Sequence, residues 1–215
     1  MIRRFDYREL LGVNNPLVKY PKLFDAAVDE FSQRKFEDAS LNDIIKKAEM
    51  SKGSLYHHFG DKFGLYLCMI DIIVEKKVAF FSSALKEKQK TGDFFGTVKQ
   101  IIKATMEFML VDMRFHHLFN NTFESSDDLL NKLKEYYDID YSKWFGVSID
   151  SAIKSEQIDN KYSQKFVSKM LQVLLTNLHE FLTTEGKPLD SSAESIMKVI
   201  NQIIDFMQYG ISAKI

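Results

Sequence analysis

The chain has 215 residues, of which 45% are apolar, and it carries 29 Lys and Arg against 30 Asp and Glu. The net charge of −1 excludes a uniformly basic nucleic-acid binder and a strongly acidic chain, and the apolar content suits a globular core. Only 3 prolines and 9 glycines are present, and no proline lies between Pro21 and Pro188. Because sandwiches and barrels need Gly and Pro for frequent turns, the sequence predicts an all-α fold.

Cysteine content and hydropathy favour a cytoplasmic protein. Cys68 is the single cysteine, which excludes an internal disulfide framework and suits a reducing compartment. Residues 1–15 include Arg3, Arg4 and Arg8 and lack the apolar segment of a signal peptide. No apolar run approaches the ~18 residues of a membrane span, so we expect no membrane partner.

Three short segments near the start of the chain have helical hydrophobic spacing. Residues 21–35 carry one apolar stripe. Ser40 can cap a second helix over residues 41–48, and Ser51 can cap a third over residues 52–58. Two short helices joined by a three-residue turn, the second of them amphipathic, are typical of a helix-turn-helix unit.

The remaining chain shows the spacing of longer helices, without a repeat or a Gly/Ser linker. The expected helices cover residues 62–88, 93–113, 115–121, 127–136, 141–154, 160–184 and 191–212. The helix from Lys62 is expected to join the two halves of the chain rigidly.

The third short helix has one apolar and one polar face. Leu55 and Phe59 lie one turn apart and are expected to point into the core. The opposite face holds no large aliphatic side chain; its members are Lys52, Gly53, Ser54, Tyr56 and His57. A glycine that permits close approach, with hydroxyl, imidazole, phenol and ammonium groups, suits contact with a DNA groove.

Residues 23–67 contain an ordered set of residues that is more specific than the pattern of a generic helix-turn-helix. The set ends in the segment 51–62, which has the spacing Tyr-x-x-Phe-x-x-Lys. Its members are Ala27, Phe31, Phe36, Ser40, Leu41, Ile44, Ala48, Met50, Ser51, Gly53, Leu55, Tyr56, Phe59, Lys62 and Leu65. With these residues the stretch resembles the DNA-binding domain of the TetR family of transcriptional regulators. The resemblance implies an all-helical homodimer with an N-terminal three-helix DNA-binding domain and a C-terminal effector-binding and dimerisation domain.

On this resemblance we divide the chain into a DNA-binding domain, residues 1–66, and an effector and dimer domain, residues 67–215. Residues 1–15 would be either a flexible terminus or an arm whose arginines enter the minor groove. The DNA-binding residues implied by position are Ser40, Ser51, Lys52, Gly53, Ser54, Tyr56, His57 and Lys62. Residues 1–66 hold 11 Lys and Arg and 10 Asp and Glu, so phosphate binding would depend on local placement of charge.

Two residues depart from the family pattern in turns. Lys35 and Glu49 stand where the family usually has glycine, at the end of the first helix and in the helix-turn-helix turn. A left-handed conformation costs a non-glycine residue about 1–2 kcal/mol, so we expect either strain or a changed turn at each position.

Aromatic and methionine side chains in the C-terminal part could line an effector cavity for a hydrophobic or planar ligand. The candidates are Met106, Met109, Met113, Phe119, Phe123, Tyr141, Trp144, Phe145, Leu174 and Leu178. His116 and His117 are adjacent and would point about 100° apart on a helix, so they do not predict a metal site. Neither a metal nor a cofactor is expected.

The last two helices carry apolar stripes that are wide for a monomer of this size. A four-helix bundle made from two copies would bury them, whereas the alternative makes both helices core elements of one subunit. The candidate dimer residues are Phe166, Met170, Phe181, Ile196, Ile200, Ile203 and Met207.

Together these features predict a repressor that a small hydrophobic or aromatic effector releases from a pseudo-palindromic operator. The effector would shift the helix that starts at Lys62 and so change the spacing of two recognition helices. The alternative is a helical interaction protein or a DNA-architectural factor without an effector. An enzyme is not expected, because the sequence shows no nucleophile triad, phosphate loop or metal-ligand set.

Overall fold

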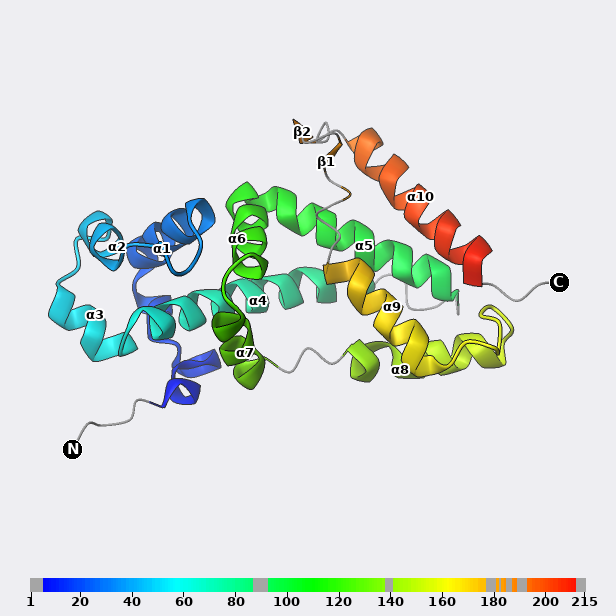
Figure 1. The fold of residues 1–215 in the computed structure, drawn as a ribbon, viewed down its shortest axis with the longest axis horizontal. Coiled ribbons are helices and arrows are strands. Elements are labelled where there is room, and N and C mark those ends of the chain that lie inside the picture. Colours follow the sequence, from blue (N-terminus) through cyan, green and yellow to red (C-terminus); the bar gives the residue numbers. More distant parts are fainter. Residues whose placement is uncertain are drawn as a thin grey trace. The chain divides into compact units, whose positions relative to one another are not determined.

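The computed structural model describes residues 6–86, 93–137, 141–176, 181, 183–184, 187–188 and 193–211. Helices dominate this part of the chain (Figure 1), and the predicted all-α class is confirmed. The chain divides into two compact units, one made of residues 1–79 and 109–138 and the other of residues 80–108 and 139–215.

The first unit begins with three short 3₁₀ helices and contains the predicted helix-turn-helix. Its elements are η1 (Tyr7–Leu10), η2 (Gly12–Asn14), η3 (Pro16–Lys19), α1 (Pro21–Gln33), α2 (Leu41–Lys47), α3 (Lys52–Phe59), α6 (Met113–Phe123) and α7 (Asp127–Tyr136). The second unit contains α8 (Tyr141–Lys154), α9 (Gln164–Thr176), β1 (Thr183–Thr184), β2 (Lys187–Pro188) and α10 (Ala193–Ile211). Helices α4 (Lys62–Lys86) and α5 (Phe94–Val111) each begin in one unit and end in the other.

Two expectations about these elements differ from the structure. A helix was predicted over residues 160–184, whereas the described helix α9 covers Gln164–Thr176 and residues 183–184 pair with residues 187–188 as a two-residue antiparallel ladder. The compact unit that holds the helix-turn-helix also includes α6 and α7, whereas we placed them in the second domain. The hydrophobic spacing of α6 showed that one face is buried, but such spacing does not identify the partner helix.

The core of the first unit contains buried side chains of α1, α3, α4 and α6. Leu23 and Phe31 of α1 and Phe59 of α3 are almost fully buried, as their spacing predicted. Tyr66 of α4 is 1% exposed and shares a 2.6 Å hydrogen bond with the hydroxyl of Thr122 on α6. This bond satisfies two buried hydroxyl groups that would otherwise destabilise the core.

Residues 6–20 are packed against α4, in contrast to the flexible terminus that we considered. The hydroxyl of Tyr7 donates to Asp61 at 2.6 Å, and the amide of Asn15 donates to Asp71 at 3.0 Å. Arg8 donates to the backbone carbonyl of Glu135 on α7 at 3.3 Å. The first contact is half-buried, the second is buried and the third is exposed, and a hydropathy pattern reveals none of them. Arg3 and Arg4 lie outside the described residues.

The second unit is a helical bundle with one hydrophobic core. In Figure 1, α10 lies along α5, and α8 and α9 form a neighbouring pair. Their shared core includes Phe94, Phe95, Val98, Ile102, Met106, Phe145, Ile149, Ile158, Val167, Leu171, Ile200, Ile203, Ile204 and Met207. Across the part of the chain that the structure describes, no helix is both long and apolar enough to span a membrane.

Candidate nucleic-acid interface

Two serine caps set the start of both helices of the helix-turn-helix, as the sequence predicted. The hydroxyl of Ser40 accepts the backbone N–H of Asp43 at 3.2 Å, and the hydroxyl of Ser51 accepts that of Ser54 at 3.1 Å. Each bond satisfies a backbone donor that the helix itself leaves unpaired. Ser40 is also held through its own N–H, which donates to the buried carboxylate of Glu30 at 2.8 Å.

The turn between α2 and α3 is strained, whereas the turn after α1 is not. Glu49 has a φ of 55°, in the left-handed region, so this non-glycine residue adopts the conformation that the family usually gives to glycine. Lys35 has a negative φ, because Arg34 already leaves α1 in an extended conformation. An exposed ion pair of 2.9 Å joins Glu49 to Lys22 and lowers the pKa of the Glu49 carboxyl.

The polar face of α3 is directed to solvent. Lys52, Gly53 and His57 are exposed, Tyr56 is 43% exposed, and Ser54 is half-buried. A β-carbon built at Gly53 would have no atom of the described residues within 4 Å. Each of the five side-chain positions predicted for this face is therefore accessible to a large partner, and Gly53 allows the closest approach of the backbone.

Lys62 makes contacts within the first unit, in addition to any that it could make with DNA. Its ammonium donates to the carbonyls of Glu37 at 2.9 Å and Ala39 at 3.1 Å, and it lies 4.8 Å from the centre of the Phe36 ring. Partial burial lowers its pKa. These contacts hold the loop between α1 and α2, and the assignment of Lys62 to DNA binding stays a prediction.

Sequence reasoning missed a contact that holds the second half of α3. The hydroxyl of Tyr20, just before α1, shares a 2.9 Å hydrogen bond with Nε2 of His58, and the two rings lie 5.3 Å apart. His58 is half-buried and next to the exposed His57. Two adjacent histidines at the edge of an apolar stripe gave no signal that would separate their roles.

A hollow of about 190 Å³ lies beside the turn between α2 and α3. It is lined by Lys19, Tyr20, Pro21, Lys22, Leu23, Ala48 and Met50. None of the residues proposed for an effector pocket contributes to it.

The candidate effector residues fall in both units. Met106 and Phe145 are buried in the core of the second unit, and Leu174 packs against that core. Met113 and Phe119 belong to the first unit, where Met113 is 45% exposed and Phe119 lies under the ammonium of Lys77. Leu178 and the side chains of Met109, Phe123, Tyr141 and Trp144 lie outside what the structure describes. Among the described residues, no group of three His, Cys, Asp or Glu side chains could hold a metal ion.

The candidate dimer residues also separate into two sets. Phe166 and Met170 on α9 are about half exposed, and Phe181 is 43% exposed. Ile200, Ile203 and Met207 are at most 9% exposed and belong to the core of their own subunit, so we correct their assignment. The side chain of Ile196 lies outside the described set. Among the described side chains of α10, the large apolar groups that are exposed are Phe206 and Tyr209, which lie outside the stripe that we had chosen.

Comparison with known proteins identifies the family to which this helix-turn-helix belongs. The family model described as "Bacterial regulatory proteins, tetR family" matches residues 23–68. The uncharacterized HTH-type transcriptional regulator YvdT of Bacillus subtilis is 26% identical over 164 residues, which are 75% of this chain and 81% of YvdT. Residues 23–68 are therefore a DNA-binding domain of the TetR type, and these matches support a TetR family regulator.

Two solved structures share the fold of this chain. A TetR family regulator from Chloroflexus aurantiacus aligns with a TM-score of 0.70 and 20% identity, over 94% of this chain and 96% of that protein. The regulator FadR from Bacillus subtilis, solved in complex with stearoyl-CoA, aligns with a TM-score of 0.67 and 15% identity, over 89% and 99%. The matched proteins are transcriptional regulators, a class that is generally not enzymatic.

Proposed function

We propose that this TetR family regulator is a dimeric repressor that binds a pseudo-palindromic operator through the polar face of α3. The observation that carries the proposal is the exposed polar face of α3. Its residues are Lys52, Gly53, Ser54, Tyr56 and His57, and the opposite face of the helix packs into the core through the buried Leu55 and Phe59. Recognition helices enter the major groove with their N-terminal residues, and here those residues are a cation, a glycine and a hydroxyl.

The dimer that the proposal requires would use the exposed apolar faces of α9 and α10. Phe166, Met170 and Val173 recur on one side of α9 and are 47–49% exposed, while Phe206 and Tyr209 of α10 are 79% and 81% exposed. Large exposed apolar side chains that recur along a helix are typical of a subunit interface.

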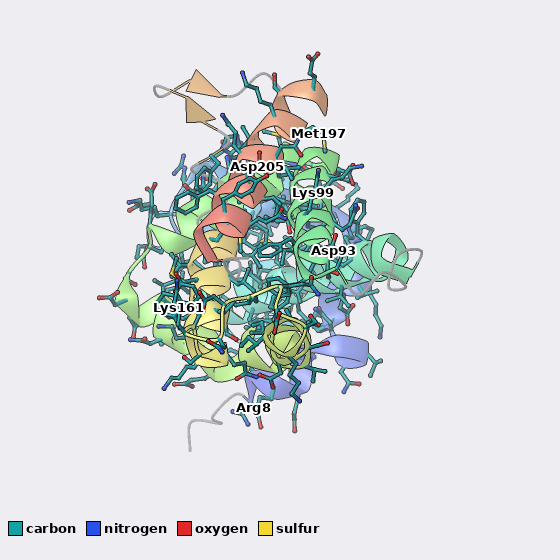
Figure 2. All side chains as sticks on the ribbon, turned by 90° about the vertical axis from the view of Figure 1, so that its right-hand side faces the viewer. Arg8, Asp93, Lys99, Lys161, Met197 and Asp205 are labelled. Atoms are coloured by element: carbon teal, nitrogen blue, oxygen red, sulfur yellow. The ribbon has the colours of Figure 1, made fainter. Side chains whose placement is uncertain are left out.

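Charge favours packing α9 of one copy against α10 of the other. Helix α9 exposes Lys165 and Lys169 and carries no acidic residue, whereas α10 exposes Glu194, Asp205 and Lys198 and has a net charge of −1. Figure 2 shows Asp205 on α10 and Lys161 just before α9. In a two-fold dimer the basic α9 of each copy would face the α10 of the other, so the contact would occur twice.

This dimer is tested by Phe206→Glu, which adds a charge to the proposed contact. Sedimentation velocity should show a monomer for Phe206→Glu and a dimer for the wild type. Val147→Glu is the matched control, because Val147 is 85% exposed on α8, outside the proposed contact. A Phe206→Glu protein that remains a dimer would place the interface elsewhere.

The proposed effector is a small hydrophobic or aromatic molecule that binds the C-terminal part. Support comes from the methionine and aromatic content of that part, and the structural neighbour FadR is a precedent for a TetR-like fold with a long-chain ligand. Such a ligand releases DNA only if it binds the DNA-free arrangement more tightly than the DNA-bound one. Repression is the commoner mode in the family.

A gel shift with the DNA upstream of the gene for this chain tests the proposal. A shift at about 50 mM salt that weakens strongly at about 200 mM salt is expected, because phosphate contacts release counterions. Footprinting should then show two half-sites about 34–36 Å apart. Equal binding to an unrelated duplex would favour the architectural alternative, and no binding at all would favour an interaction protein. Adding stearoyl-CoA as a probe ligand tests release, and tight binding without release would refute the effector mechanism.

A further inference from the structure

Helix α6 and the corner that follows it are attached to α1 at three successive levels. At the first level, Arg114 at the start of α6 bonds to Asp25 at 2.8 Å and also to Asp29, both on α1. Asp112 caps α6 and holds the guanidinium of Arg114 in place with a 2.8 Å bond. Four charges thus join the two helices at this level.

The second level is at the end of α1. The side-chain amide of Asn121 donates to the backbone carbonyls of Phe31 at 3.1 Å and Ser32 at 2.9 Å. These two carbonyls lie in the last turn of α1, where a helix leaves its C=O groups without an internal partner. Asn121 therefore caps α1 from a neighbouring helix, which local sequence could not reveal.

The third level joins the corner between α6 and α7 to the loop between α1 and α2. The N–H of Phe36 donates to the hydroxyl of Ser125 at 3.2 Å. The carboxylate of Glu37 accepts the N–H of Ser126 at 3.1 Å and also the hydroxyl of the same residue. Lys35 forms a 3.3 Å ion pair with Glu124. Partial burial acts to raise the pKa of Glu37, but the hydrogen bonds from Ser126 and Ser125 outweigh it and lower that pKa.

We infer that Asn121 and Glu37 are positioning residues for DNA binding, an inference that rests on the proposed function. They fix the end of α1 and the loop that leads to Ser40, the cap of α2. Helix α2 packs against both α1 and α3, so the orientation of α3 depends on this loop. Neither residue lies on the polar face of α3, so both act through the backbone that they hold.

The test measures DNA affinity for Asn121→Ala and Glu37→Ala by fluorescence anisotropy. The probe is a duplex from the DNA upstream of the gene for this chain, and the temperature is kept below the unfolding temperature of each variant. Each substitution should weaken binding about 3- to 30-fold, the range for residues that couple to a site without touching it. The slope of affinity against salt should stay at the wild-type value, because no phosphate contact is lost. Asn131→Ala and Glu135→Ala on α7 are matched controls and should bind like the wild type.

Glu37→Ala also tests the sign of the effect. Removal of a surface carboxylate would strengthen binding to DNA if only charge mattered, whereas a positioning role weakens it. Wild-type or tighter binding by folded Glu37→Ala overturns the inference, and this variant decides the matter if Asn121→Ala does not fold.

Hydrogen exchange separates this inference from the proposed function. The peptide covering residues 36–47 should exchange faster in Asn121→Ala than in Asn131→Ala, whether or not DNA is bound. Unchanged exchange would contradict the positioning role. A wild-type protein that binds no duplex would refute the proposed function. The exchange experiment would still test whether Asn121 holds the end of α1 and the loop that follows it.

Discussion

Replacing Gly53 with alanine separates the stability of α3 from its proposed contact with DNA. In the free protein a β-carbon at this position has no atom of the described residues within 4 Å, so alanine causes no clash there. An exposed Gly→Ala change within a helix raises the free energy of unfolding by about 0.5–1 kcal/mol. For a chain of this length, about 1 kcal/mol corresponds to a rise of about 2–4 °C in Tm.

The same methyl group would face DNA in the proposed complex. An added methyl in a closely packed interface costs about 1–3 kcal/mol, which is about 5- to 150-fold in affinity. We therefore expect Gly53→Ala to have a higher Tm by calorimetry and a weaker affinity by fluorescence anisotropy.

Ser148→Ala is the control for this experiment, because Ser148 is an exposed residue of α8 in the second unit. It should raise helix stability slightly and leave DNA affinity unchanged. Wild-type DNA affinity in Gly53→Ala would show that the α3 backbone does not approach DNA closely. A lower Tm would show that the surroundings of Gly53 are not open.

Substitutions at three positions test the strain, packing and charge described above. Glu49→Gly should be more stable than Glu49→Ala by about 1 kcal/mol in urea unfolding, because both lose the ion pair but only glycine relieves the positive φ; equal stabilities would argue against backbone strain. Gly64→Ala should lower the urea midpoint strongly, since its β-carbon would lie 1.9 Å from the backbone oxygen of Phe59, and a wild-type midpoint would contradict this packing. Glu37→Gln should be less stable than the wild type at pH 7, with a difference that shrinks as the pH falls below the ordinary pKa of 4.5, because a lowered carboxyl pKa stabilises the folded state only while the group is ionised. A difference that is constant from pH 7 to pH 3 would mean that ionisation of Glu37 contributes nothing.

Local structure in the first unit was largely predictable from sequence, because it depends on neighbouring residues. The caps at Ser40 and Ser51 and the inward positions of Leu55 and Phe59 follow from spacing alone. For Glu49 the resemblance to the family left two alternatives open, backbone strain or a changed turn, and its φ of 55° shows the first of them.

Contacts between residues far apart in sequence were not predictable. Asn121 caps a helix some ninety residues earlier, and Asp71 binds the N-terminal segment that we had considered flexible. Polar side chains of this kind leave no periodic signal, so neither their burial nor their partner can be read from one sequence. The buried face of α10 was misassigned to a dimer because an apolar stripe looks the same whether it meets its own subunit or a second copy.

The central claim is that the polar face of α3 binds duplex DNA, and a salt titration with two variants tests it most directly. Anisotropy with the upstream duplex should show that Lys52→Ala lowers the steepness of log affinity against log salt by about 1, as loss of one phosphate contact requires. Tyr56→Ala should lower affinity while sedimentation still shows the wild-type oligomer. Wild-type affinity and salt dependence in both variants would contradict the claim.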